Sequence, residues 1–395
     1  MNAPHPAAAQ LNQQGMVALR AGDWTAAAQA FEAATAHDPG SPALWRNLAT
    51  AFRSAGDDAG ELRALEAALD ADRRDLVAWI RKAELHQRRK ERGDALVAWN
   101  AAVGAAATTR GVPDALMPVL EGGRAFIAEA TAHIRAAADA ALTPLADMLD
   151  ETAARRVGAM VDHALGGRPV YVNRCAGLHY PFLPADEFFD RRHFPWLDTL
   201  EARTTAIRAE LEALLADPGE ALRPYVRMGK GLGDNVWSGL DHSLAWGACF
   251  LWEYGEPNRA VLDRCPETAA ALVAAATAPI PGRSPSAFFS ILRPHTRIPP
   301  HAGVTNTRAI VHLPLIVPPG CGFRVGGETR AWEEGRAFAF DDTIEHEAWN
   351  GSDEMRAVLI FDTWNPHLEA TERDAVVRYF AAADASGFGP KRGLG

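Results

Sequence analysis

The chain has 395 residues, of which 48% are hydrophobic, and it carries a formal net charge of −10 at pH 7. This length leaves room for two domains. Because no run of about 18 apolar residues occurs, we expect no membrane span, and the negative net charge argues against a nucleic-acid partner.

The N-terminus and the cysteines bear on the cellular location. The first ten residues lack a basic segment followed by an apolar core, so no secretory leader is expected. The four cysteines are widely spaced without a Cys-x-x-Cys motif, which favours reduced thiols over disulfides or a zinc site. These features predict a cytoplasmic protein.

Residues 8–109 repeat with a period of 34, and Gly22 and Gly56 fall at the turn between the two helices of a unit. The spacing and residue order predict about three tetratricopeptide repeats, an α-helical solenoid in which small alanines let helices approach. Its groove is expected to bind a peptide or partner protein, and the alternative is a packing or dimerisation arm. The equivalent positions are Leu11, Trp45 and Trp79; Gly15, Ala49 and Ala83; Phe31, Leu65 and Trp99; and Ala34, Ala68 and Ala102.

Residues 110–167 are expected to connect two domains. Glycines and prolines between Thr108 and Arg124 predict a linker. Alanine-rich helical patterning over residues 125–165 predicts bridging or capping helices.

Residues 168–385 are expected to form the second domain. From Ser286 onward, short apolar strands alternate with Gly and Pro turns, which favours a double-stranded β-helix of the jelly-roll (cupin-like) type. The chain is therefore predicted to be multidomain, with an N-terminal helical solenoid and a C-terminal β-domain closed by a helix over residues 370–383.

Two histidines in this domain, His301 and His346, suit ligands of ferrous iron. Non-haem Fe(II) oxygenases usually hold the metal with two histidines and one carboxylate. The carboxylate normally stands two residues after the first histidine, where this chain has Gly303. The missing acid leaves three possibilities: a subclass without the carboxylate, a halogenase that binds chloride, or a non-catalytic scaffold.

Other carboxylates near His346 are weaker candidates for the third ligand. The two glutamates are expected to point away from the histidine on a strand, and the two aspartates are expected to shape a turn. These residues are Asp341, Asp342, Glu345 and Glu347.

Arg356 and His312 interrupt apolar strands. Alternation places Arg356 on the same face as Val358 and Ile360, pointing into the barrel. A buried guanidinium needs a carboxylate, which 2-oxoglutarate or one of the protein's own acids could provide. His312 is expected either to be a satisfied core residue or to hydrogen-bond a cofactor carboxylate.

Together these residues resemble the aspartyl/asparaginyl β-hydroxylase family over roughly residues 168–366. The order and spacing of the motifs carry the resemblance. The matching stretches are Phe194–Glu201, Cys265–Thr268, Phe289–Leu292, Pro300–Asn306, His312–Leu315, Gly326–Arg330, Trp332–Gly335, Phe340–Asp342, Glu345–Glu347, Arg356 and Trp364–Pro366.

The resemblance implies an Fe(II)/2-oxoglutarate-dependent dioxygenase whose iron is held by His301 and His346 without a carboxylate. It implies that Arg356, His312 and Ser290 hold 2-oxoglutarate and that Trp246 lines the same pocket. The expected reaction hydroxylates the β-carbon of an Asp or Asn residue in a protein or peptide, using O2 and releasing succinate.

Two departures from the family pattern concern the substrate. Arg308 stands where a substrate-binding arginine is expected, but Ile310 replaces a second arginine and Ala248 replaces a polar residue. Both changed positions are expected to face substrate. A free amino acid, a small peptide or a lipid-linked acyl group therefore remains an alternative substrate.

Overall fold

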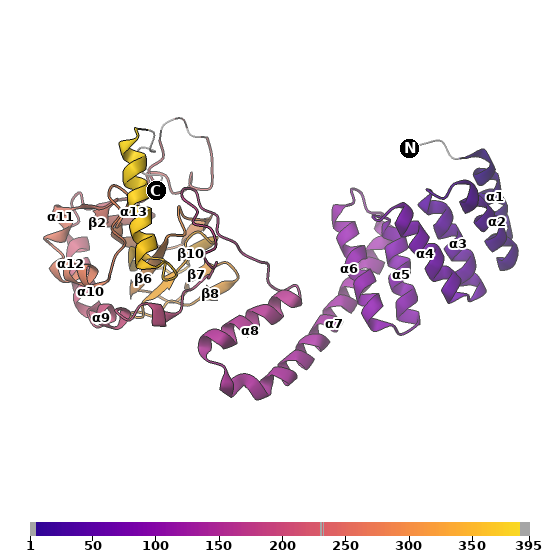
Figure 1. Cartoon of the computed structure of the whole chain (residues 1–395), viewed down its shortest axis with the longest axis horizontal. Coiled ribbons are helices and arrows are strands. Elements are labelled where there is room, and N and C mark those ends of the chain that lie inside the picture. Colours follow the sequence, from indigo (N-terminus) through magenta and orange to yellow (C-terminus); the bar gives the residue numbers. More distant parts are fainter. Residues whose placement is uncertain (1–4, 230, 232, 388–395) are drawn as a thin grey trace. The chain divides into compact units, whose positions relative to one another are not determined.

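The computed structural model describes residues 5–229, 231 and 233–387 (Figure 1). The expectation of no secretory leader falls partly on Met1 to Pro4, outside the described residues. The chain divides into two compact units, Met1–Val161 and Asp162–Gly395. Among the described helices, none is both long enough and apolar enough to cross a membrane.

Three helix pairs begin the N-terminal unit, and each pair packs against the next. Large side chains at equivalent positions are buried between the helices, with Phe31, Leu65 and Trp99 at most 3% exposed. The pairs are α1 (Pro6–Arg20) with α2 (Trp24–His37), α3 (Pro42–Ala55) with α4 (Asp58–Ala71), and α5 (Leu76–Arg88) with α6 (Arg92–Thr108).

The turn inside each pair recurs with the predicted period. Gly22, Gly56 and Lys90 have φ values of 77°, 76° and 61°. Glycine adopts this left-handed backbone without steric penalty, whereas lysine rarely does. The third turn therefore lacks the residue type that marks the first two, although its backbone is the same.

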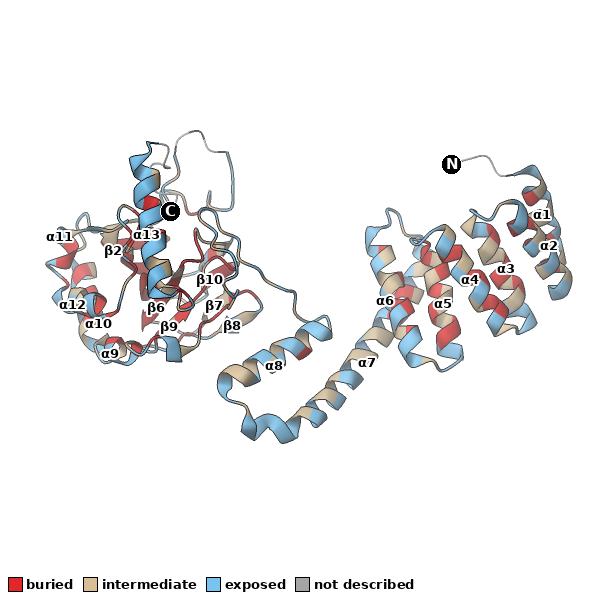
Figure 2. Cartoon of the chain, in the orientation of Figure 1, coloured by how far each residue is buried: buried red, intermediate tan, exposed pale blue. Residues whose placement is uncertain are grey.

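Helix α7 (Met117–Leu142) begins inside the segment expected to be a linker. Gly122 and Gly123 do not end it, because Gly123 faces the ring of Trp99, and a Cβ there would lie 2.7 Å from Trp99 Cζ3. The glycine allows close packing rather than a break. Two 3₁₀ helices, η1 (Asp114–Leu116) and η2 (Thr143–Met148), flank α7, and α8 (Glu151–Ala164) follows; Figure 2 shows that α7 and α8 are largely exposed.

The C-terminal unit combines short helices with antiparallel strands. Its helices are η3 (Arg191–His193), α9 (Leu197–Glu201), α10 (Thr204–Ala216), α11 (Arg259–Leu262), α12 (Pro266–Ala274) and α13 (Ala370–Ala385). Its strands are β1 (Leu222–Pro224), β2 (Trp246–Glu253), β3 (Glu256–Pro257), β4 (Ala287–Leu292), β5 (Thr296–His301), β6 (Arg308–Ile316), β7 (Cys321–Val325), β8 (Glu328–Arg330), β9 (Phe338–Phe340), β10 (His346–Asn350) and β11 (Arg356–Trp364).

These strands form two sheets. The larger has the order β1-β2-β4-β11-β6-β9, with β3 paired to β2, and the smaller has the order β5-β10-β7-β8. Apart from the β7–β8 hairpin, consecutive strands from β4 to β11 alternate between the sheets. The C-terminal unit is therefore an antiparallel β-domain whose successive strands cross from one sheet to the other.

Successive side chains of β11 point alternately into two apolar layers, one on each face of the larger sheet. Leu359 and Phe361 pack with the helices on the outer face of the larger sheet. Val358 and Ile360 pack with Phe323 of β7 between the two sheets. Arg356 shares the inner face, as predicted. The predicted fold class, an N-terminal helical repeat region with a C-terminal β-domain, is confirmed.

Candidate active site

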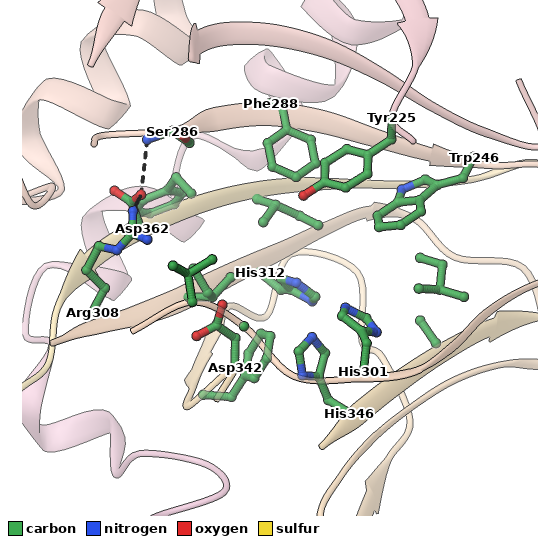
Figure 3. Close-up of a pocket in the computed structure, with 18 of the residues that line it drawn as sticks. Tyr225, Trp246, Ser286, Phe288, His301, Arg308, His312, Asp342, His346 and Asp362 are labelled. Atoms are coloured by element: carbon green, nitrogen blue, oxygen red, sulfur yellow. Dashed lines mark hydrogen bonds and ion pairs between the residues drawn. The ribbon is translucent and has the colours of Figure 1, made fainter. Parts of the chain in front are cut away.

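A cavity of about 460 Å³ opens between the two sheets (Figure 3). It brings together most of the side chains singled out by the sequence. Those that line it are Trp246, His301, Arg308, Ile310, His312, His346 and Arg356. Ser290 lies behind this lining, fully buried and hydrogen-bonded to Trp246 and Arg356.

His301 and His346 are cross-strand neighbours at the end of β5 and the start of β10, and their ring centroids are 4.0 Å apart. The strand register slips by one residue next to this pair, where β5 contains Pro299 and Pro300. Proline cannot donate a ladder hydrogen bond, so it suits such a bulge. Bulges re-aim side chains beside active sites, and here both rings line one cavity.

Backbone carbonyls hold each histidine in the form that binds a metal. The Nδ1 of His301 donates to the carbonyl of Pro299 at 2.8 Å, and that of His346 donates to Ile344 at 3.0 Å. The Nε2 lone pair is then left to ligate, as in most histidine metal sites. Burial lowers the pKa of both histidines, which keeps the rings neutral near pH 7.

Asp342 occupies the space where a side chain at residue 303 would stand. A Cβ on Gly303 would lie within 2.7 Å of both carboxyl oxygens of Asp342. Burial raises the pKa of Asp342 to about 7, against the lowering effect of Arg308. As expected, both aspartates belong to the turn before β10, in which Ile344 N donates to Asp341 O at 3.2 Å. The side chain of Asp342 also lines the cavity, whereas that of Asp341 accepts hydrogen bonds from the amide and hydroxyl of Thr343.

Asp342 does not complete a three-residue metal site by itself. Among the described residues, the two histidines belong to no group of three or more His, Cys, Asp or Glu side chains whose donor atoms all lie within 4.8 Å of one another. The protein therefore offers two nitrogen ligands, with a carboxyl group nearby.

Arg356 is 1% exposed, and no ion pair to a carboxylate is found for it among the described residues. Its Nη1 donates to Ser290 Oγ at 3.3 Å, and its guanidinium stacks on Trp332 at 4.2 Å. Burial lowers its pKa to about 9. The alternative of an internal salt bridge is thus not observed, and the buried cation lacks a counter-charge.

Three buried polar atoms at this end of the cavity have no hydrogen-bond partner among the described residues: Arg356 Nε, His312 Nδ1 and Trp332 Nε1. Leaving such groups unpaired is unfavourable. A bound carboxylate would accept from the guanidinium and relieve the unpaired charge. The donor set therefore fits the distal carboxylate of a dicarboxylic acid such as 2-oxoglutarate.

The opposite end of the cavity contains an ion pair that the sequence did not indicate. Arg308 donates to Asp362 Oδ2 at 3.0 Å, and the amide of Ser286 donates to the same oxygen at 3.1 Å (Figure 3). Burial raises the pKa of Asp362 to about 6, and Arg308 opposes the shift. Asp362 shares the face of Arg356 and Ile360, so strict alternation along β11 could have identified it.

The two positions that depart from the family pattern have different surroundings. Ile310 lines the cavity, as expected. Ala248 is fully buried in the layer between the sheets and is absent from the cavity lining, so the expectation that it faces substrate is wrong. Its strand partner on β4 is Ser290, and its methyl side chain is shorter than those of Trp246 and Phe250, which share its strand face and line the cavity.

Aromatic residues that the sequence did not single out complete one wall. Trp237 meets His301 edge to face with centroids 4.8 Å apart. Tyr225 stacks on Trp246 at 3.9 Å and approaches Phe288 at 5.1 Å. Tyr225 and Trp237 lie outside the regular strands, where sequence periodicity carries no signal.

Comparisons with known proteins agree with this geometry. Residues 201–366 match the family model Aspartyl/Asparaginyl beta-hydroxylase, and residues 12–75 match a Tetratricopeptide repeat model. The chain is 33% identical over 183 residues to the aspartyl/asparaginyl beta-hydroxylase of Mus musculus, covering 45% of this chain and 24% of that protein. It is 35% identical over 192 residues to the ornithine lipid ester-linked acyl 2-hydroxylase of Rhizobium tropici, covering 48% and 64%.

A solved structure, the Sgt2 tetratricopeptide domain from Aspergillus fumigatus, aligns with 32% of this chain and 83% of its own at 24% identity and a TM-score of 0.29. The chain spans less than two thirds of the length of either curated relative. Residues 201–366 thus match an aspartyl/asparaginyl β-hydroxylase family model, in one chain with residues 12–75, which match a tetratricopeptide repeat model.

Proposed function

We propose that this protein is an Fe(II)/2-oxoglutarate-dependent dioxygenase that hydroxylates the β-carbon of an Asp or Asn residue in a protein or peptide. The observation that carries the proposal is Arg356, a buried cation in the same cavity as the two histidines, for which the described part of the chain supplies no carboxylate partner. When bound, iron and 2-oxoglutarate supply the oxidative chemistry, with O2 consumed and succinate and CO2 released.

Different residues of the cavity would bind iron and 2-oxoglutarate. His301 and His346 would hold iron through Nε2, because their Nδ1 atoms are engaged by carbonyls. Arg356 and Ser290 would bind the distal carboxylate of 2-oxoglutarate, and His312 would contribute its unpartnered nitrogen. Trp246 orients Ser290 by donating to its hydroxyl at 3.0 Å.

Arg308 is the proposed substrate contact. It lines the cavity while paired with Asp362, so a substrate carboxylate would meet a guanidinium that is already partly neutralised. The apolar side chains of Ile310, Ile360 and Phe288 line the same cavity. This lining favours, as a second candidate substrate, the acyl group that the name of the Rhizobium tropici relative specifies.

Chlorination is less well supported than hydroxylation. A chloride beside the two histidines on the side of residue 303 would approach the Asp342 carboxyl, whose ionised form would repel it. A silent scaffold is disfavoured because the unpaired Arg356 would be a destabilising feature with no purpose. We also propose a cytoplasmic location, consistent with four cysteines that are all free thiols.

The test is succinate formation from 2-oxoglutarate under air with added Fe(II). Wild type is compared with His301→Ala and Arg356→Gln, first alone and then with Asp peptides, Asn peptides, free amino acids and acyl-linked lipids. Turnover that depends on both residues and is stimulated by one substrate class supports the proposal. Iron-loaded wild type that binds no 2-oxoglutarate in anaerobic calorimetry would refute it.

A further inference from the structure

Two carboxyl groups face one guanidinium at the end of the cavity around Arg308. Arg308 Nη1 donates to Asp362 Oδ2 at 3.0 Å, so part of its charge is already neutralised. The carboxyl group of Asp342 lines the same cavity, and in the view of Figure 3 it lies between Arg308 and His346. Burial raises the pKa of both carboxyl groups, and the charge of Arg308 opposes the shift in each case.

The other arginines that line the cavity do not offset this acidic excess. Arg283 donates to both carboxyl oxygens of Asp384 at 2.7 Å each. Arg356 lies at the end assigned to 2-oxoglutarate, and Arg227 is exposed. Arg308 is therefore the cation that a ligand at this end would meet.

One carboxyl oxygen of Asp362 lacks a donor. Oδ2 accepts from Arg308 and from the amide of Ser286, the latter at 3.1 Å. Oδ1 is buried and has no hydrogen-bond partner among the described residues, and Asp362 as a whole is 2% exposed. Its pKa of about 6 leaves the carboxyl group mostly ionised at pH 7. Because an unpaired buried acceptor is unfavourable, Oδ1 is suited to a donor on a bound ligand.

The neighbouring strands explain why Oδ1 is unpaired. On β6 the residue directly opposite Asp362 is Ile310. Side chains in such positions are close enough to touch, but isoleucine has no donor. Phe288 and Ile360, which line the same cavity, are likewise apolar. The donor that Oδ1 lacks would therefore come from the ligand.

The pair of Arg308 and Asp362 selects among the polar groups that a ligand could carry. A carboxylate would be repelled by the ionised Asp362 and has no hydrogen to donate to Oδ1. An ammonium group could donate to Oδ1, but it would be repelled by Arg308. A primary amide avoids both penalties, because its oxygen accepts from a guanidinium while its NH2 group donates to a carboxyl oxygen. The uncharged amide therefore complements this pair best.

We propose that Asp362 makes the site selective for a primary amide, so that an asparagine side chain binds in preference to an aspartate side chain. This inference rests on the proposed function, because it takes the Arg308 end of the cavity as the substrate site. Arg308 contacts the amide oxygen, and Asp362 Oδ1 accepts from the amide nitrogen. Asp362 thus determines specificity and takes no part in the oxidation itself. Asp342, in the same cavity, adds to the rejection of an anion when it is ionised.

The experiment is anaerobic calorimetry on the full chain loaded with Fe(II) and 2-oxoglutarate. The probes are N-acetyl-asparagine methylamide and N-acetyl-aspartate methylamide, which differ only in the side-chain amide or carboxylate. We expect the asparagine probe to bind about tenfold or more tightly than the aspartate probe, since it alone makes a hydrogen bond to a charged partner at Oδ1. Equal affinities, tighter binding of the aspartate probe, or binding of neither overturns the inference.

The loading step separates this inference from the function on which it rests. Binding of 2-oxoglutarate is measured before either probe is added. If 2-oxoglutarate binds but the probes are not distinguished in the expected direction, the selectivity is wrong and the proposed function stands. If 2-oxoglutarate does not bind, both are wrong.

Variants assign the selectivity to one residue. Asp362→Asn should lower the preference for the asparagine probe by about tenfold or more, because the repelling charge is removed. Glu253→Gln removes the same charge from another residue of the cavity lining, one that is paired with Arg223, and should leave the preference unchanged. Equal changes in the two variants would overturn the assignment. If Asp362→Asn fails to fold by circular dichroism, Ile310→Lys replaces it. A cation opposite Asp362 should shift the preference toward the aspartate probe, and an unchanged preference would overturn the inference.

Discussion

Replacing Gly303 with alanine tests whether Asp342 fills the space beside the two histidines. Gly303 does not have a left-handed backbone, so alanine introduces no conformational strain and only the added methyl matters. The backbone is held on both sides, because Gly303 N donates to Asp342 O at 2.6 Å and Ala176 N donates to Gly303 O at 3.1 Å. The Asp342 side chain must therefore move.

The size of the effect follows from the overlap. A Cβ at residue 303 would come within 2.7 Å of both Asp342 oxygens, and overpacking of this kind lowers the free energy of unfolding by about 1–3 kcal/mol. For a unit of this size each kcal/mol moves the melting temperature by about 2–4 °C. We expect the melting temperature of the β-domain to fall by about 2–12 °C.

The assay is calorimetric unfolding of the metal-free full chain in four forms: wild type, Gly303→Ala, Asp342→Ala and the double variant. Because Asp342→Ala removes the colliding carboxyl, Gly303→Ala should be nearly neutral in that background, which gives a coupling free energy of about 1–3 kcal/mol. An equal loss from Gly303→Ala in both backgrounds would show that Asp342 does not occupy this space.

Three further predictions concern single side chains. Arg356→Gln should weaken 2-oxoglutarate binding in anaerobic calorimetry by about tenfold or more. The ligand-free variant should be at least as stable as wild type, because a buried unpaired cation is removed. A less stable ligand-free variant would contradict this expectation. The pKa of Asp362 is raised to about 6, so between about pH 4 and pH 6 the folded state keeps a proton on this carboxyl that the unfolded state releases. The contribution of Asp362 to the free energy of unfolding therefore falls as pH rises through this range. In urea unfolding, the free energy of unfolding of Asp362→Asn should therefore fall by up to about 3 kcal/mol less than that of wild type as pH rises. An equal fall in the two proteins would refute the raised pKa of Asp362. Gly123→Ala should lower the melting temperature by collision with Trp99, whereas the neighbouring Gly122→Ala, with no atom within 4 Å, should raise it slightly; equal effects would exclude the packing explanation.

Local repetition in the sequence was enough to predict the helical unit. Contacts in a solenoid are mostly between neighbouring repeats, so the period of 34 determines which residues are buried. The structure places the third turn at Lys90, 34 residues after Gly56, and its backbone matches those of Gly22 and Gly56 although its residue type does not. That α7 runs on through Gly122 and Gly123 was not predictable in this way, since Gly123 packs against Trp99 of another helix.

In the β-domain the sequence by itself determined the candidate metal ligands and, for Arg356, the face of the strand that it occupies. Alternation along β11 placed Arg356 inward, and motif order singled out His301 and His346. Only the tertiary structure decided which groups meet: that no described acidic residue pairs with Arg356, that Asp362 pairs with Arg308, and that Asp342 fills the space at Gly303. The physical reason is that alternation fixes the direction of a side chain, whereas its counter-charge comes from strands brought together by sheet closure, dozens of residues away in the chain.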